Sequence, residues 1–235
     1  MAFLDLRRIP EPEVMDDSGE VEAYASAAAQ AHLDAIDDTF VEHAMRLVAG
    51  CDGGRAIDVG TGPGQIVIKL ARKLTLWKFV GVDRSAGMVA QAQMNLAAAG
   101  GVLAGRVEFQ TADGNSLPFP PSSFDLVMCN SVLHHLAEPG KLLGEMARLV
   151  KPDGAILLRD LRRPGRFRYR LHVWRHGRQY SGTMRKLFDD SVRAAYTPEE
   201  LQKMLDASLL SGARVFECNS THIGVERAMA RQANR

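Results

Sequence analysis

Short apolar runs alternate with amphipathic segments along most of this chain. The runs are bounded by glycine, proline or polar residues, which is typical of buried strands. They lie at 56–59, 79–82, 107–110, 124–129 and 155–158. The segments between them carry apolar residues at helical spacing, at 65–74, 85–99 and 139–150. Strands that alternate with helices in this way predict a mainly parallel sheet with helices on its faces.

The residues outside this alternation predict further helices and a hairpin. Residues 1–19 are acidic and interrupted by proline, which indicates an extended arm, and two helices are expected at 20–33 and 38–49. Lys-Pro-Asp-Gly at 151–154 predicts a turn before the fifth strand. The later elements are two helices in 180–210 and two antiparallel strands at 213–218 and 222–226.

Two residues along the chain are suited to begin predicted helices. Ser85 is suited to cap the helix at 85–99, and Gly100-Gly101 to end it. Thr197, followed by Pro198 and Glu200, has the spacing of a capping box for the second of the late helices.

Composition restricts the class of protein further. The chain has 235 residues, which suits one α/β domain, and its 29 basic and 28 acidic residues leave no overall field that would favour nucleic acid or an anionic surface. Cys51, Cys129 and Cys218 are widely separated and lack the spacing of metal ligands. Because no run is long enough to span a membrane and the N-terminus lacks the apolar core of a signal peptide, we expect a cytoplasmic protein.

The candidate chemistry begins with a glycine-rich loop between the first strand and the first helix of the alternating region. Gly60, Gly62 and Gly64 allow backbone angles and close approaches that side chains would block. Asp58 lies inside the preceding strand, and Asp83 ends the next strand. A strand, glycine loop, helix, strand and acid in this order predict a nucleoside site at the carboxyl edge of the sheet.

Two nucleoside cofactors compete for this site. NAD-dependent oxidoreductases use the spacing G-x-G-x-x-G around a pyrophosphate, whereas these glycines are spaced G-x-G-x-G. The carboxylate of Asp58 would repel a pyrophosphate but attract an ammonium or sulfonium group. This difference favours S-adenosylmethionine, and a turn without any ligand is the structural alternative.

Residues 58–64, with the sequence D-V-G-T-G-P-G, resemble the first motif of class I S-adenosylmethionine-dependent methyltransferases. The resemblance extends over roughly 56–161 and implies an α/β fold, a Rossmann-like, doubly wound, seven-stranded and mostly parallel sheet with an antiparallel last strand. Within a single domain, 1–235, it implies an N-terminal arm and cap helices at 1–50, a cofactor-binding core at 55–161, a lid or cap at 162–210, and a closing hairpin and tail at 211–235.

The resemblance also implies roles for individual residues. Asp58 would act on the methionine part, Asp83 on the ribose, and Asp113 on the adenine, although Asp113 could instead close an Asx-turn. Leading helices of such enzymes cover the cofactor, so Tyr24 is either a contact or a packing residue. The expected cofactor-binding residues are Asp58, Gly60, Thr61, Gly62, Pro63, Gly64, Asp83, Arg84, Met88, Ala112, Asp113, Gly114, Asn130 and Ser131.

The resemblance further implies that the end of the fourth strand faces the transferred methyl group, and His134 and His135 follow that strand. A histidine titrates near neutral pH and can take a proton from an acceptor, so either is a candidate catalytic base, with His134 slightly preferred. A structural role for both is the alternative. No metal is expected, because no further ligand lies at suitable spacing.

Residues 159–185 contain nine arginines interleaved with aromatic and aliphatic residues. Three interpretations remain open: a solvated amphipathic helix, a lid over an acidic or amphipathic substrate, and a nucleic-acid surface. The region 180–210 is distantly similar to that of quinone-ring C-methyltransferases. We therefore expect in-line methyl transfer to a small molecule, with an RNA methyltransferase, a non-catalytic S-adenosylmethionine-binding protein and an oxidoreductase as alternatives.

Overall fold

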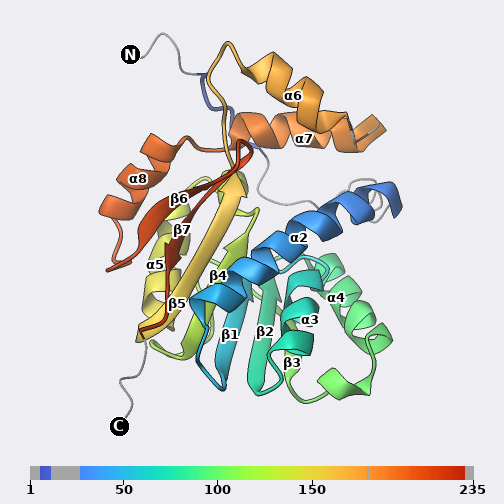
Figure 1. The fold of residues 1–235 in the computed structure, drawn as a ribbon, viewed down its shortest axis with the longest axis vertical. Coiled ribbons are helices and arrows are strands. Elements are labelled where there is room, and N and C mark those ends of the chain that lie inside the picture. Colours follow the sequence, from blue (N-terminus) through green and yellow to red (C-terminus); the bar gives the residue numbers. More distant parts are fainter. Residues whose placement is uncertain (1–5, 12–26, 179, 181, 231–235) are drawn as a thin grey trace.

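A computed structural model describes residues 6–11, 27–178, 180 and 182–230 of the chain. A seven-stranded sheet in the order β3-β2-β1-β4-β5-β7-β6 forms its centre (Figure 1). The strands are β1 (Gly54–Val59), β2 (Trp77–Asp83), β3 (Val107–Thr111), β4 (Phe124–Asn130), β5 (Val150–Leu161), β6 (Arg214–Cys218) and β7 (His222–Arg227). Strands β1 to β5 pair in parallel, and β7 is antiparallel to both β5 and β6. The predicted fold class is confirmed.

Helices cover both faces of this sheet, as the alternation of apolar runs and amphipathic segments requires. The α-helices are α2 (Ala27–Leu47), α3 (Gln65–Lys73), α4 (Ala86–Ala98), α5 (Pro139–Leu149), α6 (Tyr169–Gly177), α7 (Gly182–Ala194) and α8 (Pro198–Asp206). Short 3-10 helices, η2 (Gly101–Leu103) and η3 (Leu133–His135), follow α4 and β4. Within the described part of the chain, no helix combines the length and apolarity needed to cross a membrane.

The core consists of two apolar layers separated by the sheet. Ala56 and Ile57 are neighbours on β1 and both fully buried, yet they contribute to opposite layers because side chains alternate across a strand. One layer packs against α2, α3 and α4, and the other against α5 and α8. In Figure 1, α2 and α3 cross in front of the sheet. Strands buried on both faces explain why their sequences read as continuous apolar runs.

Two sequence predictions in this region were wrong. The helices expected at 20–33 and 38–49 form one helix where they are described, because 34–37 contains neither glycine nor proline and α2 continues through it. Lys69 on α3 spans the expected break, with its Nζ 2.6 Å from Asp34 and 2.7 Å from Asp38. The turn expected at 151–154 is instead a bulge inside β5, since Phe124 pairs with Val150 and Leu126 with Ala155.

The predicted helix caps are confirmed. The Ser85 hydroxyl accepts a hydrogen bond from the Met88 backbone N–H at the start of α4. At the start of α8, the Glu200 N–H donates to the Thr197 hydroxyl, and the Thr197 N–H donates to the Glu200 carboxylate. These caps fix where α4 and α8 begin, and α4 begins beside the candidate site.

Candidate functional site

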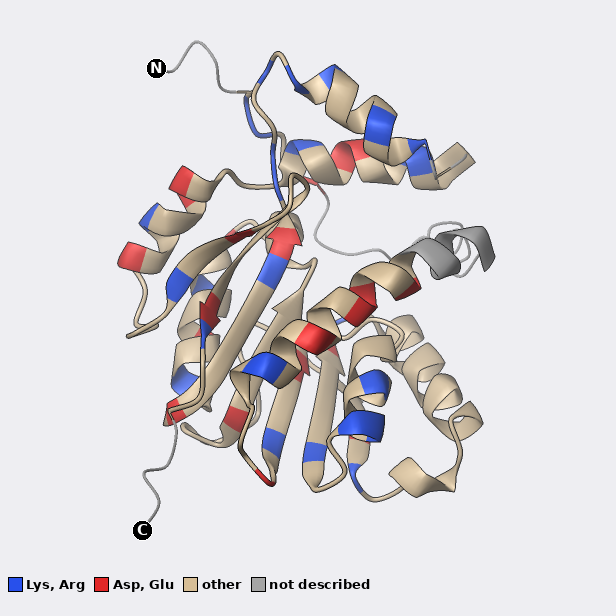
Figure 2. Ribbon diagram, viewed as in Figure 1, with Lys and Arg blue, Asp and Glu red and all other residues tan. Residues whose placement is uncertain are grey.

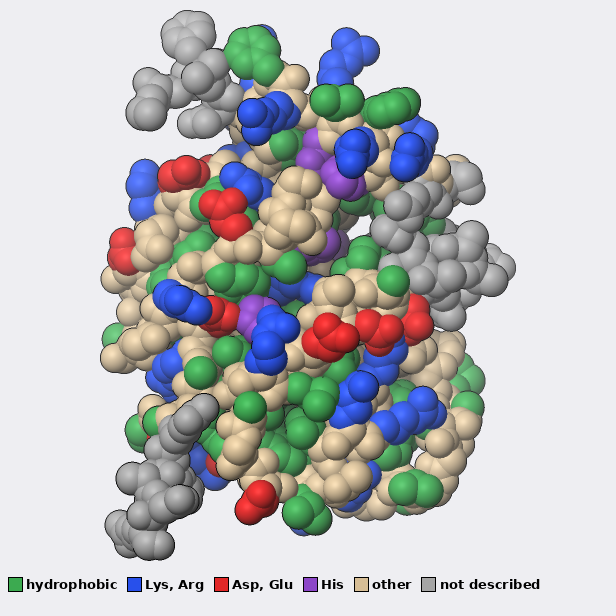
Figure 3. All heavy atoms as spheres, viewed as in Figure 1, with side chains coloured by type: hydrophobic (Ala, Val, Ile, Leu, Met, Phe, Trp, Pro, Cys, Tyr) green, Lys and Arg blue, Asp and Glu red, His purple; other side chains and the backbone are tan. Residues whose placement is uncertain are grey.

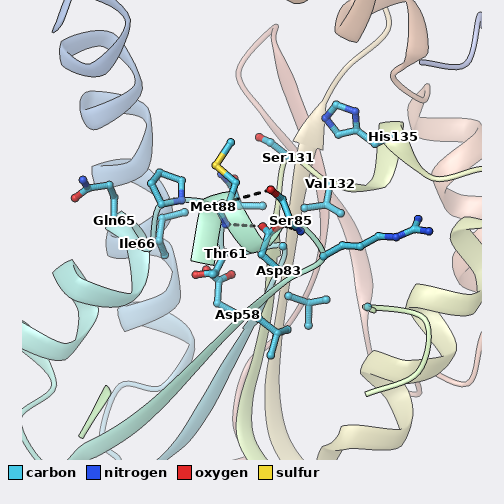
Figure 4. Close-up of a pocket in the computed structure, with 18 of the residues that line it drawn as sticks. Asp58, Thr61, Gln65, Ile66, Asp83, Ser85, Met88, Ser131, Val132 and His135 are labelled. Atoms are coloured by element: carbon cyan, nitrogen blue, oxygen red, sulfur yellow. Dashed lines mark hydrogen bonds between the residues drawn. The ribbon is translucent and has the colours of Figure 1, made fainter. Parts of the chain in front are cut away.

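A cavity of about 880 Å³ lies at the carboxyl ends of β1, β2 and β4, and α2 contributes to its wall (Figure 4). Ligand cavities in open α/β sheets form at this edge, and this volume lies within the usual range for small-molecule sites. Its walls include Asp58, Gly60, Thr61, Gly62, Pro63, Asp83, Arg84, Met88, Ala112, Asp113, Gly114, Asn130, Ser131 and His135. Of the residues singled out from the described sequence, Gly64 and His134 are not part of the lining. Tyr24 lies outside the described residues.

The structure requires glycine at the three loop positions to different degrees and for different reasons. Gly60 has φ +75°, and a Cβ there would lie 2.2 Å from the Val132 side chain. Gly64, with φ +78°, begins α3, and its Cβ would lie 2.5 Å from the ring of Phe109. Gly62 has φ +53° but no atom within 4 Å of a built Cβ. Gly60 and Gly64 are therefore needed for packing, and Gly62 alone faces open space.

Asp83 connects the loop to the next helix. Its Oδ2 accepts a 2.8 Å hydrogen bond from the Gly62 N–H, and its Oδ1 accepts one of 2.9 Å from the Ser85 N–H (Figure 4). Burial raises the pKa of Asp83, and these backbone donors oppose the shift. Each carboxylate oxygen has a further lone pair, so the group can accept from a ligand hydroxyl while it holds the loop.

Two other acids in the cavity have raised pKa values because they are buried. Burial raises the pKa of Asp58 to about 7 and that of Asp37 to about 6. Asp58 is 1% exposed, and its Oδ1 has no hydrogen-bond partner within the described residues. Sequence reasoning missed Asp37 because it placed residue 37 in a gap between two helices, whereas α2 carries it to the cavity wall. Burial therefore destabilises the charged forms of both acids, which a cationic ligand would stabilise.

The end of β4 contributes Asn130 and Ser131. Ser131 has φ +58°, which is strained for a non-glycine residue and is common at functional sites. The Asn130 Oδ1 accepts a 3.0 Å hydrogen bond from the Arg159 Nε. Arg159 also donates to the Thr39 hydroxyl at 2.7 Å and to the Ile36 carbonyl at 3.1 Å. The buried Arg159 side chain thus connects β5 to α2 by hydrogen bonds.

Asp113 adopts the turn that was the alternative to its adenine role. Its Oδ1 accepts a 2.9 Å hydrogen bond from the Asn115 N–H, which is an Asx-turn. The same residue lines the cavity beside Ala112, whose N–H donates to the Asp83 carbonyl at 2.9 Å. The turn and a ligand contact are therefore compatible, and the adenine role stays a prediction.

The two histidines occupy different environments. His134 is buried, its Nδ1 lies 2.5 Å from the Asp160 Oδ1, and its backbone N–H donates to the Asp160 Oδ2 at 3.0 Å. Burial lowers the pKa of His134, but Asp160, with a smaller contribution from Glu11, more than offsets this, so the pKa is raised. His135 lines the cavity wall (Figure 4). This geometry gives His135, and not the preferred His134, access to a ligand.

Glu11 joins this pair from the N-terminal arm. Its Oε2 lies 3.9 Å from the His134 Nε2 and 3.8 Å from the His135 Nδ1, and the three residues are of types that bind metal ions. The ligands of a tetrahedral zinc ion lie roughly 3.3–3.5 Å apart, given bonds of about 2.0–2.2 Å. The wider spacing here is that of ion pairs. The absence of a metal stays a prediction.

The arginine-rich segment is divided between the interior and the surface. Arg159 lies within β5, and Arg163 is 4% exposed, where it donates to the Ala195 carbonyl and to Glu200. The remaining residues of the segment lead into α6 and α7, which lie beyond the carboxyl ends of the strands (Figure 1). Arg159 and Arg163 are therefore buried and make structural contacts, so neither is part of an exposed basic surface. Whether the helices form a lid stays a prediction.

Comparison with known proteins relates the chain to methyltransferases. Residues 57–158 match the family model described as "Methyltransferase domain". The chain is 32% identical over 130 residues to a ubiquinone/menaquinone biosynthesis C-methyltransferase of Geobacter sulfurreducens, covering 55% of this chain and 50% of that protein. The chain spans about half the length of the curated relatives it matches.

Solved structures share the fold. The YcgJ protein of Bacillus subtilis is 26% identical and superposes with a TM-score of 0.56 over 77% of this chain and 68% of that chain. A methyltransferase structure from Aquifex aeolicus superposes with a TM-score of 0.64 over 91% of this chain and 99% of that chain, at 20% identity. The second likeness extends the common fold to nearly the whole chain.

Proposed function

We propose that this chain, whose residues 57–158 match the methyltransferase domain model, is a class I S-adenosylmethionine-dependent methyltransferase that transfers a methyl group from S-adenosylmethionine to a small-molecule acceptor. The observation that carries the proposal is the buried carboxylate of Asp58, whose Oδ1 has no hydrogen-bond partner among the described residues. A buried carboxylate oxygen without a partner is costly, and a cationic ligand would compensate it. A pyrophosphate in the same place would add repulsion.

The residues of the cavity fit S-adenosylmethionine. Asp58 and Asp37 would hold its cationic methionine part, and Asp83 would accept hydrogen bonds from the ribose hydroxyls. Asp113 and Ala112 would hold the adenine. The open side of Gly62 leaves room for a ligand against the loop backbone. An oxidoreductase is disfavoured because these acids surround the position that a pyrophosphate would need.

When bound, S-adenosylmethionine supplies an already activated methyl group on a sulfonium. The chain's own contribution is then to hold donor and acceptor in line and to exclude water, which can lower the barrier by up to roughly 7–11 kcal/mol. α2 contributes to this by covering the cavity, with Leu33, Asp34 and Asp37 in its wall. Charge-assisted binding by Asp58 and Asp37 would orient the donor.

His135 is the candidate base for an acceptor that must lose a proton. It lines the cavity, and Glu11 lies within 3.8 Å of its Nδ1. His134 is poorly suited, because Asp160 stabilises its charged form and a protonated imidazole cannot accept a proton. His134 would instead hold η3, and with it His135, against the end of β5.

A quinol-type aromatic ring is the acceptor that we propose. The likeness to a ubiquinone/menaquinone biosynthesis C-methyltransferase supports this class, and the partly apolar cavity wall, which includes Val132, Leu136 and Leu142, suits a ring. An RNA acceptor is less favoured, because the net charge of the chain is only +1. A non-catalytic S-adenosylmethionine-binding protein would have the same cofactor residues.

Calorimetric titration with S-adenosylmethionine, S-adenosylhomocysteine and NAD tests the cofactor. We expect the first two to bind and NAD not to bind. Transfer of a labelled methyl group to hydroquinones with and without prenyl chains, compared with bulk RNA, tests the acceptor. If the labelled methyl group were transferred to RNA and not to the hydroquinones, the small-molecule assignment would be refuted. Binding without transfer to either class would favour the non-catalytic alternative, and tight NAD binding would refute the cofactor assignment.

A further inference from the structure

One side of α6 presents large apolar side chains to solvent. Leu171 is 62% exposed and Trp174 58%, and Phe167, in the turn before the helix, is 80% exposed. Their spacing of four and three residues places them within about 60° of one another around a helix axis, because each residue advances about 100°. Scattered exposed apolar residues are ordinary in proteins, but three that form one stripe indicate an interaction surface.

Packing within the protein uses the other side of α6. His172 and Gly177 are buried, and the Tyr169 hydroxyl donates a hydrogen bond to Asp189 on α7. These contacts attach α6 to α7 and leave the stripe of Phe167, Leu171 and Trp174 without a role in the core. In Figure 1, α6 is the outermost helix at its end of the molecule. The stripe therefore faces outward from a protruding helix.

Basic side chains surround the stripe. The segment 161–188 contains eight arginines, one lysine and no acidic residue, so it carries nine positive charges in a chain whose net charge is +1. The rest of the chain is therefore net negative. Six of these arginines are exposed and form no ion pair with an acid in the described part of the chain: Arg166, Arg168, Arg170, Arg175, Arg178 and Arg185. In Figure 2 the charged positions of α6 are all basic, and in Figure 3 hydrophobic and basic side chains lie next to one another at the end of the molecule that α6 forms.

We propose that α6 docks this protein onto the surface of a membrane that contains anionic lipids. Aromatic and aliphatic side chains on one side of a helix, flanked by arginines, are the composition of helices that lie in the membrane interface. Phe167, Leu171 and Trp174 would enter the boundary between headgroups and acyl chains, and the arginines would contact the lipid phosphates. RNA would use the arginines and the two aromatic rings, but it offers no partner for Leu171, which lies between them.

The inference does not depend on methyl transfer, since it is carried by residues outside the cavity. It would, however, bring the carboxyl end of the sheet, where the cavity lies, towards the membrane, because α6 and α7 lie beyond that end (Figure 1). A membrane-docked enzyme of this kind could take its acceptor from the bilayer.

Vesicle flotation and the fluorescence of Trp174 test the proposal directly. The chain has two tryptophans, and Trp77 is 1% exposed, so a blue shift on adding vesicles reports on Trp174. At about 0.15 M salt, we expect the full chain to float with phosphatidylcholine vesicles that contain about 30 mol% phosphatidylglycerol, with at least about tenfold weaker binding to phosphatidylcholine alone.

Matched variants separate the stripe from general surface hydrophobicity. The triple variant Phe167→Ser, Leu171→Ser, Trp174→Ser should lose at least about tenfold in vesicle partitioning. The control Leu76→Ser, Val102→Ser, Leu209→Ser replaces side chains that are 71%, 86% and 85% exposed elsewhere, and it should bind as the parent does. The variant Arg170→Gln, Arg175→Gln, Arg178→Gln should lose about fivefold per arginine. Circular dichroism and cofactor titration would verify that each variant is folded.

Four outcomes would overturn the proposal. They are an absence of flotation with anionic vesicles, equal binding to both lipid mixtures, unchanged binding by a folded stripe variant, and RNA binding that persists at about 0.15 M salt while vesicles are ignored. Should the triple stripe variant fail to fold, Leu171→Ser alone in the parent background provides the same comparison, with an expected loss of several-fold. If the protein failed to bind vesicles but still transferred methyl groups, the membrane-docking proposal would be refuted and the proposed function would not be affected.

Discussion

The raised pKa values of Asp58 and Asp37 predict that cofactor affinity depends on pH. Burial raises the pKa of Asp58 to about 7 and that of Asp37 to about 6, so both carboxyl groups are partly protonated near neutral pH in the free protein. A cationic ligand binds the ionised form. Affinity should therefore rise as pH increases through these values, and binding near pH 7 should release protons.

The expected size of the effect follows from the ionised fractions. Between about pH 6.0 and 7.5, ionised Asp58 rises roughly eightfold and ionised Asp37 roughly twofold. The α-amino group of the ligand, with a pKa of about 7.7–8.0, loses about a third of its charge over the same range. The net prediction is a rise in affinity of about tenfold, or about 1.4 kcal/mol, with about half a proton released by Asp58 at pH 7.

Calorimetry at several pH values, repeated in buffers of different ionisation enthalpy, measures both quantities. The variant Asp58→Asn should bind about ten- to a hundred-fold more weakly at pH 7.5 and retain only the small pH dependence of Asp37. Asp206→Asn, on the exposed part of α8, is the matched control and should behave as the parent. A parent affinity that is flat between pH 6.0 and 7.5, or an Asp58→Asn variant with the same slope, would refute the reasoning.

Three further predictions concern the base, the ribose and the loop. His135→Ala should lower turnover with little change in cofactor affinity, while His134→Ala should lower thermal stability as well; steady-state kinetics and melting curves separate the two, and full activity of His135→Ala would leave positioning as the mechanism. Asp83→Ala should weaken S-adenosylmethionine binding by roughly ten- to a hundred-fold in calorimetry, and unchanged affinity in a folded variant would contradict the ribose role. Gly64→Ala should destabilise the fold by about 2–4 kcal/mol in urea unfolding, from the left-handed backbone and the clash together, and Gly62→Ala by only about 1–2 kcal/mol; equal losses would contradict the packing role of Gly64.

The sheet-edge acids could be predicted because each lies where sequence pattern and topology coincide. Asp58 and Asp83 are marked by apolar runs that read as parallel strands, and the carboxyl ends of such strands meet at one edge. Asp113 follows the same logic after β3. Such features can be predicted from the sequence because strand burial and helix capping are determined by residues that lie close together along the chain.

The contributions of α2 and the N-terminal arm could not be predicted in the same way. Asp37 reaches the cavity only because α2 continues through 34–37 and lies across the sheet, which is a tertiary contact without a local motif. Glu11 comes within ion-pair distance of residues 134 and 135 across more than a hundred positions of sequence. Arg159 seemed to belong to a surface segment because neighbouring arginines obscured its position in a strand, where burial lowers its pKa to about 10.

Arg159 has a consequence for how the cavity is closed. Its guanidinium bonds the Ile36 carbonyl and the Thr39 hydroxyl of α2, on either side of Asp37, and its Nε bonds the Asn130 side chain in the cavity wall. Its charge also lowers the pKa of Asp37, against the larger effect of burial. Arg159 therefore holds the segment of α2 that carries Asp37, and together with the larger effect of Lys69 it favours the charged form of this acid. Removing Arg159 would release α2 from β5 and raise the pKa of Asp37 further, so the helix that covers the cavity and the charge of the acid that it contributes both depend in part on this side chain.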